Sequence, residues 1–276
     1  MSAVAATILQ RYVQKDSKLH PLGYIVLPCA IATVLLLVLA LIRGYDTRWE
    51  LLPKFNLLLL AVVWPIANLL YVSAMRRVEA SQFSVIFTTR VLWVIIASAI
   101  FLNERLPLAA VVGALFLFAS SVLALWEEGI SYRHIGILYV LLNAMLAGLG
   151  VTNDGVILSR GYDVISYFVI GFAVTPLVFW IISPNARSSS FSIIRDRKLF
   201  LQATTLAILY AISAVTLFYA FQKGRELSIL SSLNQIQTIL IVLGAAILLK
   251  ERRYLTRRLI AAIISFIGVL LVINTQ

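Results

Sequence analysis

The sequence contains only one cysteine and two histidines among its 276 residues. Cys29 has no second cysteine to pair with, which excludes a disulfide within the chain. His20 and His134 are far apart, and no Cys, His and carboxylate residues cluster with metal-ligand spacing. The chain also lacks a Gly-rich phosphate loop, a GxSxG motif and a long polar segment. We therefore expect no metal, no cofactor and no enzyme activity.

Charged residues are scarce: they make up 13% of the chain, whereas hydrophobic residues make up 61% and the mean hydropathy is +0.97. Soluble domains contain about 25% charged residues. The apolar runs are long enough to cross a hydrocarbon core roughly 30 Å thick, and they lack the alternation of barrel strands. The composition therefore predicts an all-α integral membrane protein, multi-pass in a cell membrane, which we interpret as a bacterial inner membrane.

Acidic residues number 12 against 23 basic residues, which gives a formal net charge of +11. The basic residues fall mostly between the apolar runs, with Arg11, Arg76 and Arg258 assigned to such loops. We interpret them as topology signals and lipid contacts rather than as a nucleic-acid surface. More of them follow odd-numbered than even-numbered spans, and this bias places the C-terminus outside.

Nine full spans and an N-terminal stub are predicted from the apolar runs. Residues 2–13 are apolar but too short to span. The full spans are Pro21–Ile42, Leu57–Met75, Phe83–Leu102, Leu106–Trp126, Ile135–Ser159, Val164–Ile182, Leu199–Phe221, Leu227–Leu249 and Leu255–Ile273.

Much of the chain consists of an internal sequence repeat. The stretch from Tyr71 to Leu125 returns 147 residues later, and its polar residues fall in register. The matching pairs are Glu79 and Glu226, Ser81 and Ser228, Ser84 and Ser231, Glu104 and Glu251, and Arg105 and Arg252. We interpret residues 1–126 and 127–276 as two copies of one unit.

The stub fits this repeat, because Ile8-Leu9-Gln10-Arg11 resembles Ile157-Leu158-Ser159-Arg160. We therefore expect the stub to be the tail of a first helix that lacks its N-terminal part. The parent plan has ten helices in two five-helix repeats. Because each repeat has an odd number of spans, the two copies have inverted orientations around a central cavity.

Arg90 is the clearest candidate for a functional residue, because it lies near the middle of a span, where an ionisable group is costly. Its repeat partner is Gln237, and Phe87, one turn earlier, corresponds to Asn234. In an inverted repeat both i, i+3 pairs are expected to line the cavity, where Arg90 would favour a carboxylate or phosphate. The alternative is a structural hydrogen bond from Arg90 to a neighbouring helix.

Trp64, Asn68 and Tyr71 form one stripe of a helix and combine an indole, an amide and a phenol. Such a stripe suits a pocket for a small amphipathic metabolite, although ordinary helix packing is an equal alternative. Tyr210 and Ser213 form a weaker polar stripe on the matching helix of the second half.

Asp154 shares a helix face with Asn143, three turns away. A carboxyl group within a span is a candidate for proton coupling. The alternative is that Asp154 pairs with Arg160 or a loop.

Tyr71-Val-Ser-Ala74, Glu79-Ala-Ser81, Asn103-Glu104-Arg105 and the small-residue span that follows resemble the EamA domain of the drug/metabolite transporter superfamily. The second half repeats the pattern with Glu226-Leu-Ser228 and Lys250-Glu251-Arg252. The resemblance implies ten helices in two inverted repeats, and the export of amino acids or other small metabolites.

We therefore hypothesise a permease that moves a small polar or amphipathic metabolite by alternating access, as a monomer or homodimer in the lipid bilayer. Its site residues would be Arg90, Phe87, Asn234, Gln237, Trp64, Asn68, Tyr71 and Tyr210, with Asp154 as the proton-coupling group. The alternative hypothesis is a flippase or scramblase for a lipid or lipid-linked headgroup, because a cavity arginine also suits a phosphate.

Overall fold

The computed structural model describes residues 2–15, 20–104, 108–125, 135–224, 226–234, 237–251 and 255–273, and within these ranges it contains helices and no strand. The helices are α1 (Ser2–Lys15), α2 (Gly23–Arg43), η1 (Trp49–Leu51), α3 (Lys54–Met75), α4 (Ala80–Phe87), α5 (Arg90–Phe101), α6 (Leu108–Leu125), α7 (Ile135–Leu158), α8 (Val164–Ile182), α9 (Pro184–Arg195), α10 (Arg197–Gln222), α11 (Leu227–Leu233), α12 (Gln237–Leu248) and α13 (Leu255–Ile273).

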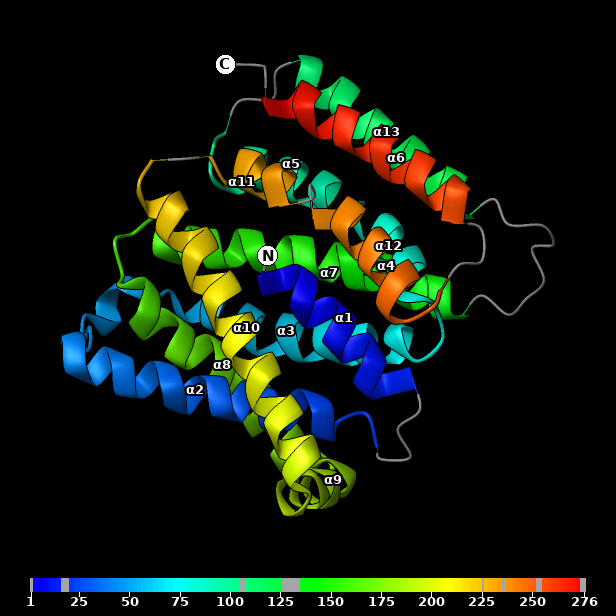
Figure 1. The fold of residues 1–276 in the computed structure, drawn as a ribbon. Coiled ribbons are helices and arrows are strands. Elements are labelled where there is room, and N and C mark those ends of the chain that lie inside the picture. The colour runs from blue at the N-terminus through cyan, green and yellow to red at the C-terminus, as the bar shows by residue number, and fades with distance from the viewer. Residues whose placement is uncertain are drawn as a thin grey trace.

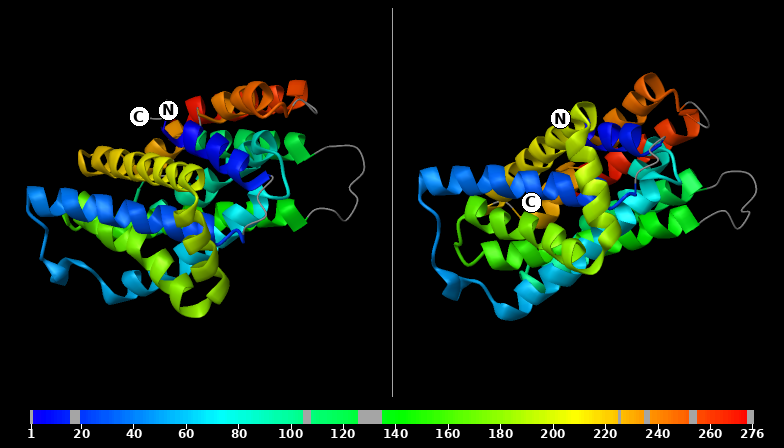
Figure 2. Two further views of the ribbon diagram at one scale, coloured as in Figure 1. Left: turned by 60° about the horizontal axis from the view of Figure 1, so that its bottom comes forward. Right: turned by 90° about the horizontal axis from the view of Figure 1, so that it is seen from below.

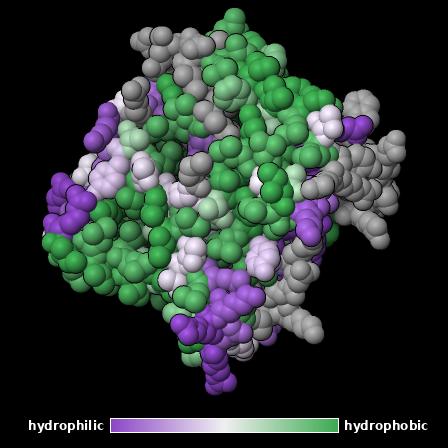
Figure 3. All heavy atoms as spheres, in the orientation of Figure 1, coloured by the Kyte–Doolittle hydropathy of each residue, from purple (hydrophilic) through white to green (hydrophobic). Residues whose placement is uncertain are grey.

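Many of the helices are apolar on their outer surface, as expected in a lipid bilayer. Within the described ranges, six segments are long and apolar enough to cross a membrane, namely α2, α3, the stretch Ala80–Phe101, α7, α8 and α10. Large apolar side chains point outward from them; Ile42 is 78% exposed and Ile181 is 76% exposed. Figure 3 shows apolar side chains over most of one face, with polar ones gathered toward its margins. The prediction of an all-α, multi-pass membrane protein is confirmed.

The helices pack in pairs along the length of the molecule. α6 lies beside α13, α2 beside α8, α3 beside α7 and α1 beside α10. Figures 1 and 2 show the α6–α13 pair on one side of the molecule and α2 with α8 on the other, with α1, α3, α7 and α10 between them. The interior of the fold therefore lies among these middle helices.

Two predicted spans are interrupted, which corrects the expectation of continuous helices over Phe83–Leu102 and Leu227–Leu249. The first divides into α4 and α5 at Thr88 and Thr89. The hydroxyls of these threonines donate to the carbonyls of Val85 and Ile86 at 2.6 and 2.9 Å, and their backbone N–H groups bond to the same carbonyls. This i to i−3 pattern tightens the helix locally into a 3₁₀ turn.

Two further details differ from the sequence-based expectations. The segment after α8, expected to be a loop, contains the amphipathic helix α9, whose N-cap Ser183 accepts from the backbone N–H of Ala186. Arg11 and Arg258, expected in loops, lie within α1 and α13 and are buried. Both arginines pair with carboxylates, Arg11 with Glu251 and Arg258 with Glu79, and these pairs make burial of the charges possible.

The repeated glutamates cap helices of the opposite half. The Glu104 carboxylate accepts from the backbone N–H groups of Leu227 and Ser228, at the start of α11, at 2.7 and 3.2 Å. The Glu251 carboxylate accepts from the N–H of Ala80, at the start of α4, at 2.7 Å. Each glutamate thus satisfies N–H groups that a helix leaves open and complements the helix dipole. The recurrence of Glu104 and Glu251 in the sequence has a structural cause.

A hydrogen-bonded cluster around Asp46 joins the loop after α2 to the start of α8. The Asp46 carboxylate accepts from the Arg48 guanidinium at 2.8 and 2.9 Å and from the backbone N–H of Asp163 at 2.9 Å. The Asp46 carbonyl accepts from the Tyr162 hydroxyl at 2.7 Å. The Arg48 hydrogen bonds, followed by those from backbone N–H groups, lower the pKa of Asp46 to about 2.

We predict that acid weakens this loop junction. The pKa of Asp46 is depressed in the folded protein from 3.8 to about 2, so its stabilisation is complete above pH 4 and is lost as the pH falls toward 2. Asp46→Asn should lower the melting temperature in detergent at pH 7, and its difference from wild type should shrink between about pH 4 and pH 2. A difference that stays constant over this window would show that the Asp46 carboxylate does not support the junction.

Candidate functional site

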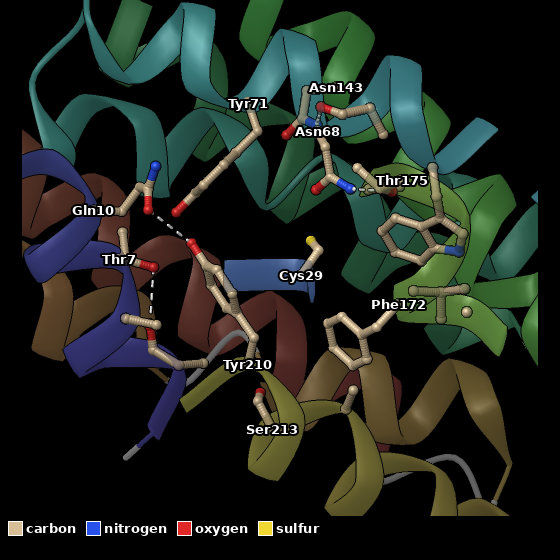
Figure 4. A pocket seen from close by; sticks show the side chains of 18 of the residues that line it. Thr7, Gln10, Cys29, Asn68, Tyr71, Asn143, Phe172, Thr175, Tyr210 and Ser213 are labelled. Carbon is tan, nitrogen blue, oxygen red and sulfur yellow. Dashed lines mark hydrogen bonds between the residues drawn. The ribbon is translucent and has the colours of Figure 1, made fainter. Parts of the chain in front are cut away.

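A cavity of about 280 Å³ lies among the middle helices (Figure 4). This volume is close to the lower end of the range for small-molecule sites, roughly 300–1,000 Å³. All nine residues proposed from the sequence line its wall: Trp64, Asn68, Tyr71, Phe87, Arg90, Asp154, Tyr210, Asn234 and Gln237. The structure therefore brings together side chains from α3, α4, α5, α7, α10 and α12 and from the residue that follows α11.

Arg90 stands at the end of a short aromatic ladder. Its guanidinium lies over the Phe87 ring, 5.1 Å from the ring centroid. The Phe87 ring stacks on Phe83 at 5.2 Å, and Phe83 meets Tyr71 edge to face at 5.2 Å. Among the described residues Arg90 has no carboxylate partner, and its Nε is buried without an acceptor. The aromatic rings therefore position the Arg90 guanidinium at the cavity wall by a cation–π contact, and no carboxylate of the described ranges neutralises its charge.

The two helix interruptions coincide with the repeated polar positions. Phe87 ends α4 and Arg90 begins α5, so the tightened turn separates the members of this pair. Asn234 follows α11 and Gln237 begins α12, so the equivalent pair also flanks an interruption. A mid-helix 3₁₀ turn often marks a functional hinge. Here both interruptions present polar side chains to one cavity.

Asp154 is buried in the cavity wall and has partners on two other helices. Its carboxylate accepts from the Tyr167 hydroxyl of α8 at 2.6 Å and from the Trp64 indole N–H of α3 at 3.2 Å. It makes no ion pair with Arg160, which was one of the alternatives considered from the sequence. The arrangement provides two neutral donors to one acid and leaves the carboxyl free of a countercharge.

The remaining cavity amides are held by neighbouring helices. The Asn68 side-chain amide donates to the Thr175 hydroxyl at 3.1 Å, and that of Asn143 donates to the Ala67 carbonyl at 2.7 Å. The Tyr210 hydroxyl donates to Gln10 Oε1 at 3.2 Å, and Figure 4 shows the Tyr71 and Tyr210 side chains converging from opposite sides. These bonds fix the wall while leaving other polar atoms open.

Three polar atoms of cavity-lining residues are buried without a protein partner: Gln10 Nε2, Arg90 Nε and Asn143 Oδ1. Gln10 is fully buried and Asn143 is 3% exposed. An unsatisfied buried polar group costs free energy, so such groups need an explanation. Two donors and one acceptor on the wall of one cavity match a bound polar solute or the waters that replace it.

The sequence-based prediction missed several lining residues. Thr7 and Gln10 of α1, Phe172 and Thr175 of α8, and Cys29 of α2 all line the cavity, and Tyr167 holds Asp154. A signal was present for α1, because Ala3, Thr7 and Gln10 fall at helical spacing on one face. Nothing comparable marks Thr175, which has apolar neighbours on both sides in α8.

Two glycines of α7 permit the close packing behind the cavity. A Cβ on Gly148 would lie 2.6 Å from the Trp93 Cβ and 2.9 Å from the Arg90 carbonyl oxygen. A Cβ on Gly150 would lie 3.1 Å from the Trp64 ring. The backbone of α5 can therefore pack directly on α7 at Gly148, next to Arg90. At Gly150 the absence of a side chain leaves room for the Trp64 indole, which donates to Asp154.

The groups on the cavity wall are suited to binding a solute. Within the described ranges, no three His, Cys, Asp or Glu side chains come together in a way that could hold a metal ion. The wall offers one unpaired guanidinium, amides, hydroxyls and aromatic faces. These groups can recognise an anionic or polar solute with an apolar part.

Comparisons with known proteins agree with this picture. The model of the EamA-like transporter family matches residues 1–126. No curated protein matches the chain. Among solved structures, 28 chains match, and one described as "Crystal structure of protein" has a TM-score of 0.68 at 16% identity, covering 98% of this chain and 94% of its own. At this identity the likeness shows the fold alone.

We predict that Gly148→Ala destabilises the protein. The added methyl must separate α5 from α7, and overpacking of this kind costs about 1–3 kcal/mol. The matched control is Gly171→Ala on α8, whose Cβ would meet Phe168 at an ordinary 3.5 Å. Thermal unfolding in detergent should show a lower melting temperature for Gly148→Ala only. Equal melting temperatures for the two variants would contradict the close packing of α5 on α7.

Proposed function

We propose that the chain is a multi-pass membrane permease built from two inverted five-helix repeats, the second being residues 127–276. The match of residues 1–126 to the model of the EamA-like transporter family supports a membrane transporter. The solute, the direction and the mechanism are inferred from the cavity.

Reciprocal packing supports the inverted repeat. α3 packs on α7, and their repeat counterparts α10 and α1 pack on each other. α4 packs on α12, and α11 packs on α5. The glutamate that follows α5 caps α11, and the one that follows α12 caps α4. Each of these contacts between the halves has a repeat-related counterpart, which is the pattern expected of a pseudo-two-fold axis in the membrane plane.

The unpaired Arg90 guanidinium is the observation that carries the substrate proposal. It lines a cavity of metabolite size, and among the described residues no carboxylate neutralises it. A charge without a counterion within the membrane costs free energy. An anionic group of the solute would lower this cost by forming charge-assisted hydrogen bonds with the Arg90 guanidinium. The solute would be small and polar or amphipathic, an amino acid or another anion-bearing metabolite, and its movement would be export by alternating access.

The apolar part of such a solute would meet the aromatic side of the cavity. Phe87, Phe168, Phe172 and Trp64 all line the wall. Gln10 and Asn143 would meet its remaining polar groups, because Gln10 Nε2 can donate and Asn143 Oδ1 can accept. The cavity thus separates a cationic pole from an apolar wall, which is the pattern that an amphipathic anion fits.

We predict that Arg90→Ala abolishes solute movement in proteoliposomes loaded with a panel of labelled amino acids and organic anions. Arg90→Lys keeps the charge but loses the planar guanidinium, so it should retain partial transport. The matched control is Arg187→Ala, which removes an exposed arginine of α9 and should transport at the wild-type rate. Melting temperatures in detergent establish that each variant is folded.

The same vesicles distinguish the alternative function. Transport of an anion that survives Arg90→Ala would remove Arg90 from the substrate site. Movement of fluorescent phospholipids between leaflets, without movement of any solute, would replace the permease by the flippase or scramblase, because a phosphate headgroup is also an Arg90 ligand.

Asp154 is the proposed proton-coupling group. It lines the same cavity as Arg90, lacks a countercharge and is held by two neutral donors, the Tyr167 hydroxyl and the Trp64 indole. A carboxyl in this setting can gain or lose a proton without breaking an ion pair. Its exposure to the cavity would let proton binding and solute binding influence each other.

We predict that Asp154→Asn removes the dependence of transport on a pH gradient but preserves solute exchange without a gradient. The amide keeps the shape of the side chain and cannot bind a proton reversibly. Asn153→Ala, at a neighbouring residue of α7 that bonds to Asn56 instead, is the control and should keep its response to pH. If gradient-driven transport persists in Asp154→Asn, the coupling group lies elsewhere.

A further inference from the structure

A buried ion pair joins the two halves of the chain next to the cavity. Arg11 Nε of α1 lies 2.9 Å from Glu251 Oε1, and the two side chains are 9% and 4% exposed. Arg11 also donates to the Met75 carbonyl at the end of α3. The other oxygen of Glu251 caps α4 at Ala80. A single glutamate therefore ties α1 and α4 to the turn between α12 and α13.

The Arg11–Glu251 ion pair lies next to the cavity. Gln10 lines the cavity wall, and Arg11 is the next residue of α1. A second ion pair, between Arg258 of α13 and Glu79 before α4, lies at the same end. Figure 1 shows α1 ending on the side of the molecule where α4 begins, whereas α7 ends on the opposite side, near the start of α11.

The sequence repeat supplies the same two residue types at that opposite end. Ile157-Leu158-Ser159-Arg160 corresponds to Ile8-Leu9-Gln10-Arg11, so Arg160 is the counterpart of Arg11. Glu104 is the counterpart of Glu251 and caps α11, as Glu251 caps α4. Yet no ion pair joins Arg160 to Glu104, and Arg160 is exposed.

Arg160 and Glu104 are nevertheless at one site. Gly155 of α7 packs on Leu227, the first residue of α11, so closely that a Cβ would lie 2.7 Å from its side chain. Glu104 accepts from the N–H of that same Leu227. Arg160 lies in the turn that follows α7, where its backbone N–H bonds to the Ile157 carbonyl at 3.2 Å. The end of α7 and Glu104 therefore both lie at the start of α11, and no ion pair joins Arg160 to Glu104.

We propose that Arg11–Glu251 and Arg160–Glu104 are alternating closures of the two ends of the cavity. The structure shows the state in which the first pair is formed; in the other state the first pair opens and Arg160 closes on Glu104. This inference rests on the proposed alternating-access permease. In this exchange the Arg11–Glu251 pair that breaks is offset by the Arg160–Glu104 pair that forms, which keeps the two states close in free energy.

The exchange explains two features that otherwise have no common cause. Arg160 lies in the turn after α7, is exposed, and has no carboxylate partner among the described residues. The two capping glutamates keep their helices capped in either state, because each uses one or both oxygens on backbone N–H groups. Arginine is suited to the moving role, since its five donors reach a carboxylate already engaged.

Cross-linking in lipid tests the exchange without any solute. In a Cys29→Ser background, one variant carries Arg11→Cys with Glu251→Cys and another carries Arg160→Cys with Glu104→Cys. Direct disulfides require Cα atoms within about 7 Å, closer than an Arg–Glu pair places them, so a bifunctional maleimide is used. Arg187→Cys with Glu104→Cys is the control for random cross-linking.

Both repeat-related pairs should cross-link well above the control, and a four-cysteine variant should never carry both links in one molecule. Cross-linking of Arg160→Cys with Glu104→Cys at the control level would overturn the proposal, and so would both links in one molecule. If the protein transports solute but fails the cross-linking test, the permease proposal is supported and the ion-pair exchange is wrong. If the two cross-links exclude each other but no solute moves, the exchange is supported and the permease proposal is wrong.

A second measurement keeps the native cap of α11. In the Arg11→Cys, Glu251→Cys variant, adding Arg160→Gln leaves every other contact of this structure in place, so it should raise the ratio of cross-linked to free protein by up to about fivefold, the effect of losing one exposed ion pair. Arg160→Lys should restore the original ratio. An unchanged ratio in Arg160→Gln would mean that Arg160 is a solvated surface charge and would overturn the exchange.

Discussion

Every polar group inside the membrane must find its partner within the protein, because hydrocarbon offers none. This constraint accounts for most of the polar side chains in the described structure. Thr88 and Thr89 bond back to the carbonyls of their own helix, Asn143 bonds to the backbone of α3, and Glu104 and Glu251 bond to opened helix starts. Those that remain without a partner are informative for the same reason.

Three of the buried polar atoms without a protein hydrogen-bond partner belong to residues that line the cavity. Arg90, Gln10 and Asn143 each have a buried polar atom without a protein partner, and all three line the cavity. The helix interruptions that flank Phe87 and Arg90, and Asn234 and Gln237, open toward the same space. These three unsatisfied polar atoms leave the cavity wall with hydrogen-bonding capacity for a polar group or for water.

The two halves are joined through their glutamates rather than through apolar packing alone. Each glutamate stands after the second helix of an interrupted span in its own half and caps the first helix of the interrupted span in the other. A change at one end of the cavity is therefore transmitted to a helix that carries cavity residues of the other half, since α4 ends at Phe87 and α11 is followed by Asn234. This arrangement gives a physical route from the rims to the site.

The sequence by itself determined the membrane class, the helical character of the chain and nine of the residues that line the cavity, because hydropathy and helical spacing are local properties of the chain. Asp154 could be recognised as a buried acid, but its partners Trp64 and Tyr167 lie on other helices and could not be read from spacing. The interruptions at Thr88 and Asn234, the helix α9 and the burial of Arg11 and Arg258 were decided by tertiary structure. The physical reason is that a turn tightens, or a charge is buried, only where a neighbouring helix supplies the space or the opposite charge.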